Sequence, residues 1–187
     1  MEIRTAFIDA MSRAVTGVTV VTTNGPDGKF GQTVSAMSSV TADPPTLLIC
    51  IKTTSVIVDA IRAHQTFGVN VLRSDQRRVA DTFAGRSTWG SPYDFTVAQW
   101  DESHEGIPLL LGAVSRFACR LGQAVQVGTH LVMFGEVIAA EVSPGNPLLY
   151  ARRSYGEHVE IPRQVVDLGF EQDVRLVDED RQKGFHE

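Results

Sequence analysis

Apolar residues near the N-terminus recur at the three- to four-residue spacing of a helix. The stripe consists of Ile3, Phe7, Ala10, Met11 and Ala14. Charged residues such as Arg4 and Asp9 fall outside it, so the pattern predicts an amphipathic first helix that ends before Gly17.

The next segment has the composition of a β-hairpin. Residues 18–23 are mostly β-branched, which predicts a strand, and residues 24–28 (Asn-Gly-Pro-Asp-Gly) form a dense turn signal. A second strand is expected from residue 29 to about residue 41, before the chain is broken at residues 43–45 (Asp-Pro-Pro).

Short strands and short helices are expected over the middle of the chain. Strands are predicted over 47–51 and 66–72. Ser55 is a candidate N-cap for one helix, and Ser74-Asp75 for another that carries Val79, Ala80 and Phe83. A polar loop is expected over 85–106.

Two long strands are predicted near the end of the domain, at 113–127 and 130–142, joined by Gly128-Thr129. Helices do not alternate regularly with strands, so a doubly wound sheet is disfavoured. The fold class is mainly β with short helices, and long antiparallel strands with tight turns favour a barrel.

The composition is that of one soluble domain. The 187 residues include 43% hydrophobic side chains, and the net charge of −5 makes a nucleic-acid-binding protein less plausible. The N-terminus lacks the apolar core of a signal peptide, and no apolar run reaches the length of a membrane span, so a cytoplasmic location is expected. Cys50 and Cys119 stand in apolar runs and are predicted to be buried free thiols, without zinc-site spacing.

The stretch from Gly31 to Thr41 carries an unusual number of hydroxyl groups for a buried strand. Strict alternation would put Thr33, Ser35, Ser39 and Thr41 on one face, with Ser38 pointing away unless a bulge intervenes. Hydroxyls and backbone amides suit the ring edge and ribityl chain of a flavin. The alternative is a strand with one solvated face.

Two further segments could contact phosphates. Lys52-Thr53-Thr54-Ser55 joins a strand to a helix, and its cation, hydroxyls and helix N-terminus suit an anion. In Phe83-Ala84-Gly85-Arg86 the arginine could hold a phosphate by two hydrogen bonds. The alternatives are an ordinary N-cap and an exposed loop arginine.

His130 and the segment 147–155 are candidates for a nucleotide site. His130 stands at the turn of the last long hairpin, where it could orient a ligand or could be a solvated turn residue. Segment 147–155 mixes aromatics with arginines, which could stack on a nicotinamide or adenine and meet phosphates, or could form a capping loop. No Gly-x-Gly-x-x-Gly or Walker motif is present, so a Rossmann domain is not expected.

Taken together, these segments resemble the flavin reductase family with the FMN-binding split-barrel fold. The matching phrases are FIDAMSRAVTGVTVVTT (7–23), TVSAMSSVTADPP (33–45), FGVNVL (67–72), Phe83-Ala84, Gly128-Thr129-His130 and PLLYARRSY (147–155). Their order and spacing match over residues 3–160. The family often has Gly-Asp-His where this chain has Gly128-Thr129-His130, so any role of that acid is missing.

The resemblance implies a six-stranded antiparallel split barrel that works as a homodimer with two flavins at its interface. It also implies an NAD(P)H-dependent flavin reductase, in which hydride passes from C4 of NADH or NADPH to N5 of FMN or FAD, and the reduced flavin serves a partner monooxygenase. The matching domain would span residues 1–162. Residues 163–187 would be a C-terminal extension, in which 174–177 could be a strand.

The resemblance further implies which residues form the site. His130 is the candidate catalytic residue and would hold the nicotinamide nucleotide with Tyr150 and Arg153. Lys52, Ser55 and Arg86 would hold phosphates. The full set of candidate cofactor-binding residues is Gln32, Thr33, Val34, Ser35, Ser38, Ser39, Lys52, Thr54, Ser55, Phe83, Ala84, Arg86, Tyr150, Arg153 and Tyr155, and no metal ligand is expected.

Two other functions remain open from the sequence. One is a split-barrel flavin oxidase that retains a tightly bound FMN, and the other is a flavin-binding carrier or sensor without catalysis. The sequence leaves undecided whether the flavin is FMN or FAD, whether the donor is NADH or NADPH, and which monooxygenase is served.

Overall fold

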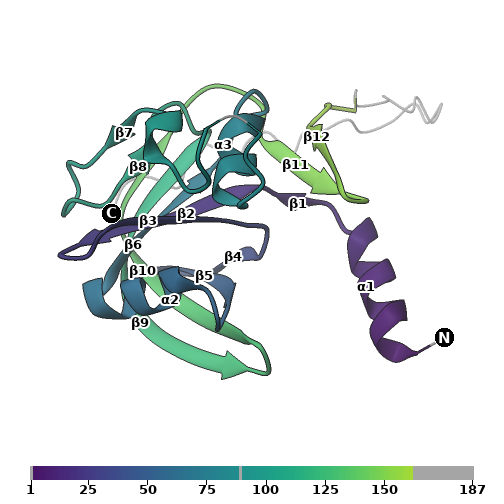
Figure 1. Ribbon diagram of the computed structural model, residues 1–187, viewed down its shortest axis with the longest axis horizontal. Coiled ribbons are helices and arrows are strands. Elements are labelled where there is room, and N and C mark those ends of the chain that lie inside the picture. The colour runs from purple at the N-terminus through teal and green to yellow at the C-terminus, as the bar shows by residue number, and fades with distance from the viewer. Residues whose placement is uncertain (1, 89, 162–187) are drawn as a thin grey trace, which may run out of the picture.

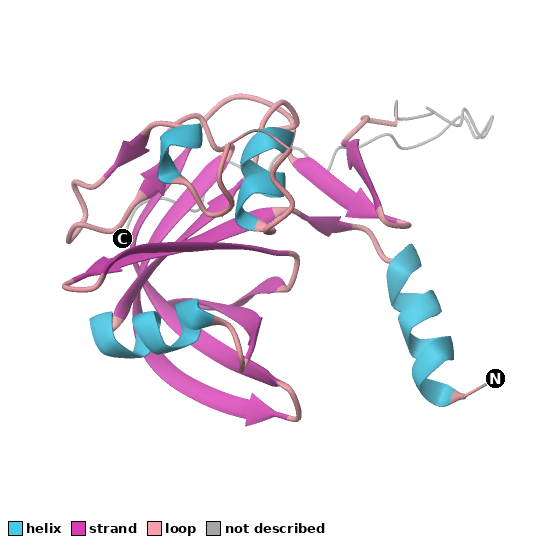
Figure 2. Ribbon diagram, viewed as in Figure 1, coloured by secondary structure: helices cyan, strands magenta, loops and turns pink. Residues whose placement is uncertain are grey.

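The computed structural model describes residues 2–88 and 90–161, which form a mainly β structure with three α-helices in that part of the chain (Figure 1, Figure 2). The helices are α1 (Ile3–Arg13), α2 (Val56–His64) and α3 (Arg77–Phe83), with a short 3₁₀ helix η1 (Phe95–Val97). The strands are β1 (Thr16–Gly17), β2 (Thr19–Gly25), β3 (Gly28–Val34), β4 (Met37–Ala42), β5 (Pro45–Lys52), β6 (Thr66–Val71), β7 (Trp100–Asp101), β8 (Leu109–Leu110), β9 (Ser115–Val127), β10 (His130–Val142), β11 (Leu148–Ala151) and β12 (Ser154–Glu157). The predicted fold class, the first helix and the long β9–β10 pair are confirmed.

The main sheet has seven strands in the order β3-β2-β6-β9-β10-β5-β4, and every neighbouring pair is antiparallel. β3 and β4 lie at opposite edges of this order, although only Ser35 and Ala36 separate them in the sequence. A two-residue link between opposite edges requires the sheet to curl round on itself, which makes a barrel. The Ala36 carbonyl accepts a 3.0 Å hydrogen bond from the Cys50 N–H at this link.

The predicted single strand over 29–41 is therefore wrong, and so is the six-strand count. The chain bends at Ser35-Ala36 and forms two strands where one was expected. The bend contains neither Gly nor Pro, so the sequence lacks the usual signal for a turn at this point.

Two of the three apolar clusters of the described residues lie next to the candidate active site. One lies inside the barrel and contains Ile49, Phe67, Val69 and Met133, all 0% exposed, with α2 covering it. The other lies beneath α3, where the Phe83 ring packs edge-to-face on Phe95 and Trp100 at centroid distances of 5.0 and 5.6 Å. At Gly31 on β3 an added Cβ would lie 2.5 Å from the Phe83 ring, so glycine is needed for this packing.

The two predicted helix caps have different outcomes. Ser55 occupies the N-cap position of α2, but its hydroxyl donates to Gln32 Oε1 and makes no capping bond. α3 begins at Arg77 with Gln76 as N-cap, so the prediction of Ser74-Asp75 is wrong. The Asp75 carboxylate is instead paired with Arg73 at 2.7 Å, which removes it as a cap.

Helix α1 projects away from the body of the protein (Figure 1) and has no buried residue. Its apolar stripe faces solvent, with Ile3, Phe7 and Met11 at 83%, 63% and 52% exposure. A backbone hydrogen bond of 2.5 Å from Arg152 N–H to Ser12 O connects the end of this helix to the hairpin formed by β11 and β12.

Other expectations have mixed outcomes. The predicted loop over 85–106 contains η1 and β7.

Both cysteines are free, but only Cys119 is fully buried, and burial raises the pKa of its thiol to about 12. The predicted extension at 163–187, including the possible strand at 174–177, lies outside the described residues. Among the helices of the described ranges, none has the length and apolar character of a membrane span.

Candidate active site

A cavity of about 160 Å³ lies where the end of β3, the end of α3 and the β11–β12 hairpin meet. Its lining residues are Val18, Thr33, Val34, Ser35, Ala84, Arg86, Tyr150 and Tyr155. All of these except Val18 belong to the predicted cofactor-binding set. The fold thus brings together residues that are more than a hundred positions apart in the sequence.

The β3 side of the cavity carries two hydroxyl groups, of which one is hydrogen-bonded within the protein and the other is not. The Thr33 hydroxyl donates a 2.7 Å hydrogen bond to the Ala80 carbonyl, so it fixes α3 to β3. Ser35, at the bend between β3 and β4, is exposed and lines the cavity. Of the two hydroxyls, the Ser35 group is the one available to a ligand, since it makes no hydrogen bond to another described residue.

The α3 side presents a guanidinium at the end of a short helix. Gly85 has φ +70°, a left-handed conformation that ends α3 and turns Ala84 and Arg86 toward the cavity. A hydrogen bond between the Arg86 guanidinium and the Tyr150 side chain raises the pKa of the arginine. Phe83, also predicted as a cofactor contact, is instead 0% exposed in the core below the cavity.

Two tyrosines form the third wall. Tyr150 and Tyr155 are opposite each other on β11 and β12, and their rings meet edge-to-face at 5.5 Å. The Tyr155 hydroxyl donates a 2.8 Å hydrogen bond to Asp81 Oδ1 on α3. Burial, and then the Asp81 carboxylate, raise the pKa of Tyr155 to about 12, so the phenol is neutral at physiological pH.

A second group of predicted residues continues from the cavity along the barrel. Gln32, next to Thr33, accepts the hydrogen bond from Ser55, and Ser55 N–H donates to Lys52 O at 2.9 Å. Lys52 is the cross-strand partner of His130. This group therefore forms a connected strip from the cavity to the tip of the β9–β10 hairpin, and it includes Thr54 between Lys52 and Ser55.

His130 is exposed at that tip and does not line the cavity. Its Nδ1 lies 3.0 Å from the Thr129 hydroxyl, which stands where the family often has an acid. The Thr129 hydroxyl can hold the imidazole but cannot supply the negative charge of a carboxylate.

Ser38, Ser39 and Arg153 also lie outside the cavity. Ser38 and Ser39 are exposed on β4, opposite Leu48 and Leu47 of β5. The register shifts between Ser39 and Thr41, so strict alternation does not hold along this stretch, and an irregularity of the kind left open by the sequence is present. Arg153 is in the turn between β11 and β12, where it lines a different hollow with the end of α1.

Sequence reasoning missed several residues around the cavity. Val18 lines it, Asp81 accepts the Tyr155 hydrogen bond, and the Arg77 guanidinium lies over the Tyr155 ring at 5.3 Å. Val18 belongs to an ordinary β-branched run, and the charged pair on α3 has helical spacing typical of a solvated face. None of these carried a signal in the sequence.

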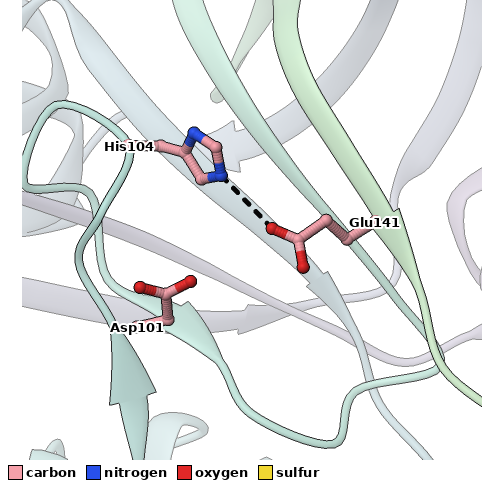
Figure 3. A group of neighbouring side chains, drawn as sticks. All are labelled: Asp101, His104 and Glu141. Atoms are coloured by element: carbon pink, nitrogen blue, oxygen red, sulfur yellow. Dashed lines mark hydrogen bonds and ion pairs between the residues drawn. The ribbon is translucent and has the colours of Figure 1, made fainter.

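A separate charged cluster joins the loop after β7 to the long β9–β10 pair (Figure 3). Asp101, His104 and Glu141 have ligand atoms within 4.8 Å of one another, and His104 Nε2 lies 3.2 Å from Glu141 Oε1. The Arg116 guanidinium lies 2.5 Å from Glu141 and 3.5 Å from Asp101. The side chain of Arg116 thus brings a positive charge to both carboxylates, and we interpret the cluster as an ion-pair network that anchors the loop.

Comparisons with known proteins agree with this architecture. The sequence matches the family described as "Flavin reductase like domain" over residues 11–158. It is 42% identical over 154 residues to a protein of Ancylobacter novellus named FMN reductase (NADH) RutF, covering 81% of this chain and 83% of that protein.

Solved structures of flavin reductases also resemble this chain. The NADH:FAD oxidoreductase SgcE6 of Streptomyces globisporus C-1027, in complex with NAD and FAD fragments, superposes with a TM-score of 0.75 at 31% identity, covering 86% of this chain and 94% of that one. The styrene monooxygenase flavin reductase SMOB of Pseudomonas putida S12 has a TM-score of 0.73 at 26% identity, covering 83% and 99%. The predicted resemblance is confirmed, and the chain belongs to the flavin reductase like family.

Proposed function

We propose that this protein is an NADH-dependent flavin reductase that delivers reduced flavin to a monooxygenase component. The observation that carries the proposal is the cavity in which Ser35, Arg86 and the Tyr150–Tyr155 pair converge. The family membership and the reductase names of the relatives support the same reaction class. The partner is inferred from SMOB, whose name ties it to styrene monooxygenase.

The residues of the cavity fit one part of a flavin. Its walls combine apolar surface at Val18 and Val34 with aromatic rings, a hydroxyl and a guanidinium, as expected for a planar ring with polar edges. Its volume of about 160 Å³ is below the roughly 300–1,000 Å³ of ligand pockets in general. The remaining flavin surface would lie along the strip formed by Gln32, Ser55 and Lys52, or against a second subunit.

The chemistry would come mainly from the bound cofactors. A flavin held there would accept a hydride from a nicotinamide nucleotide, a reaction that needs alignment of two rings more than it needs a general base. In this chain Ser35 and Ser38–Ser39 would contact the flavin, while Lys52, Ser55 and Arg86 would hold phosphate. Tyr150 and His130 would align the nicotinamide.

We further propose that the protein is a homodimer. Among the described residues, nothing buries the stripe of Ile3, Phe7 and Met11 on helix α1, and an exposed apolar helix face is typical of an interface. Light scattering should give about twice the monomer mass of 20.4 kDa, and a monomer at micromolar concentration would contradict the proposal.

The decisive experiment is anaerobic stopped-flow oxidation of NADH in the presence of FMN or FAD. A flavin reductase will consume NADH at a rate that saturates with added flavin, and it will not require oxygen. A flavin oxidase would instead purify with tightly bound FMN and turn over NADH slowly. A carrier or sensor would bind flavin without hydride transfer.

Three further assignments rest on the sequence. We propose that residues 1–162 form the reductase domain, which agrees with the family match over 11–158. The extension at 163–187 and the cytoplasmic location stay predictions.

A further inference from the structure

A second hollow, of about 390 Å³, lies between the end of α1 and the β11–β12 turn. Its lining residues are Asp9, Ser12, Arg13, Arg152 and Arg153. Three guanidiniums face one carboxylate, which leaves an excess of two positive charges in a protein whose net charge is −5. This local excess favours an anion.

The two arginines of the turn are not paired. The Asp9 carboxylate lies 3.5 Å from Arg13, and both of those side chains are more than 60% exposed. Neither Arg152 nor Arg153 makes an ion pair with any residue in the described ranges. Arg152 N–H donates to Ser12 O, which covers one of the carbonyl groups at the end of α1 that would otherwise repel an anion.

The backbone of this turn is held in a costly conformation. Arg152 and Arg153 have φ values of +49° and +60°, so both are left-handed, and they form the two-residue loop between β11 and β12. Loops of this geometry strongly prefer Asn-Gly, because glycine and asparagine adopt positive φ more readily than other residues. Local strain of this kind is often found at ligand sites, and here it presents two guanidiniums at one point.

The same hairpin connects this hollow to the candidate active site. Tyr150 and Tyr155 are a cross-strand pair that lines the first cavity. The turn formed by Arg152 and Arg153 lies two positions further along the hairpin. At about 3.3 Å per residue, the turn lies roughly 7 Å along the hairpin from the tyrosines. A ligand with its ring near the tyrosines can therefore extend its phosphates toward the arginines.

We propose that Arg13, Arg152 and Arg153 form a subsite for the diphosphate of an adenylate, as found in the adenylate half of a nicotinamide dinucleotide or of FAD. This inference rests on the proposed flavin reductase function and adds Arg13 and Arg152 to the predicted site. Guanidiniums suit phosphate because they donate paired hydrogen bonds in a fixed plane.

The test replaces both turn arginines by the dipeptide that the backbone prefers, Arg152→Asn with Arg153→Gly, so that the hairpin is kept while the charges are removed. Calorimetric titration with ADP should give a dissociation constant at least about 10-fold higher in the variant. The control is Arg62→Gln, which removes one exposed arginine on α2 outside this hollow and should leave ADP affinity unchanged. Arg152→Lys with Arg153→Lys should recover part of the affinity.

Kinetics then identify the source of the adenylate. If it belongs to NADH, kcat/KM falls by at least about 10-fold more with NADH than with reduced nicotinamide mononucleotide, which lacks the adenylate. If it belongs to FAD, KM rises for FAD and not for FMN when the mononucleotide is the donor. ADP affinity that is absent in the unaltered protein, or the same in both, overturns the subsite, as does a variant without either kinetic change.

This design separates the two proposals. A protein that oxidises NADH with flavin but fails the ADP test keeps the proposed function and loses the subsite. A protein that binds ADP at this turn but does not reduce flavin with NADH loses the proposed function.

Discussion

The Tyr155 hydroxyl donates a 2.8 Å hydrogen bond to Asp81, which joins the β11–β12 hairpin to helix α3 across the candidate active site. The Asp81 side chain is 27% exposed and also lies 3.5 Å from Arg77. Together with the Arg77 guanidinium, which lies over the Tyr155 ring at 5.3 Å, this contact holds two walls of the cavity together. The site geometry and the stability of the protein should therefore respond together when it is removed.

We expect Tyr155→Phe to lower the free energy of unfolding by about 1–2 kcal/mol, because a half-buried carboxylate loses its hydrogen-bond donor. Flavin affinity should fall several-fold with it. Urea unfolding and flavin titration measure the two effects. The control is Tyr93→Phe, at a residue that is 54% exposed and whose hydroxyl makes no hydrogen bond within the described residues. Equal stability of the two variants would contradict a role for the contact.

The same hydrogen bond should affect how the free energy of unfolding depends on pH in the alkaline range. The pKa of Tyr155 is raised from 10.0 to about 12, so the folded state holds this proton more tightly than the unfolded state. The resulting stabilisation is complete below pH 10 and is lost as pH rises toward about 12. The stability of the unaltered protein should decline more steeply than that of Tyr155→Phe in this window, as measured by urea unfolding at several pH values.

Ser35→Tyr should block flavin binding without unfolding the protein. Ser35 is exposed at the bend between β3 and β4, so a larger side chain meets no core atom, but it would fill a cavity of only about 160 Å³. We expect the FMN dissociation constant to rise by about 100-fold or more, measured by fluorescence quenching. Ser91→Tyr, at an exposed loop residue outside this cavity, serves as the control. Normal FMN affinity in a folded Ser35→Tyr variant would remove this cavity from the flavin site.

His130→Ala should raise KM for NADH and slow hydride transfer by about 10- to 100-fold, while flavin affinity changes little. The reason is that His130 does not line the cavity, so its loss leaves the walls that would bind the flavin ring unchanged. Stopped-flow kinetics and flavin titration separate the two effects. His158→Ala, at an exposed histidine after β12, is the matched control. Unchanged NADH kinetics would exclude His130 from the site, and lost flavin binding would assign it to the flavin.

Arg116→Met should lower the urea midpoint at neutral pH, because Asp101 and Glu141 would then face each other without the guanidinium. Arg116, followed by His104, lowers the pKa of Glu141 below its usual 4.5. The stabilisation from this pair is therefore present above about pH 4.5 and is lost as pH falls through the lowered pKa. The difference in urea midpoint between the unaltered protein and Arg116→Met should become smaller in acid. A constant difference across this range would contradict the ion-pair interpretation.

The sequence by itself determined the elements whose pattern is local. The helical spacing from Ile3 to Ala14, the β-branched run after Gly17 and the long strands on either side of Gly128-Thr129 each specify their own secondary structure. The predicted cofactor-binding set also contained every residue that lines the cavity except Val18.

Only the tertiary structure decided how these elements close into a barrel. The bend at Ser35-Ala36 follows from pairing at both edges of the sheet, β3 with β2 and β4 with β5, and long-range pairing leaves no pattern in one stretch of sequence. For the same reason the sequence could not reveal that Tyr155 would meet Asp81, that Phe83 would sink into the core, or that Arg152 would lie against Ser12. The identity of a side chain determines which interactions it can make. Packing between distant segments determines which partner residue it meets.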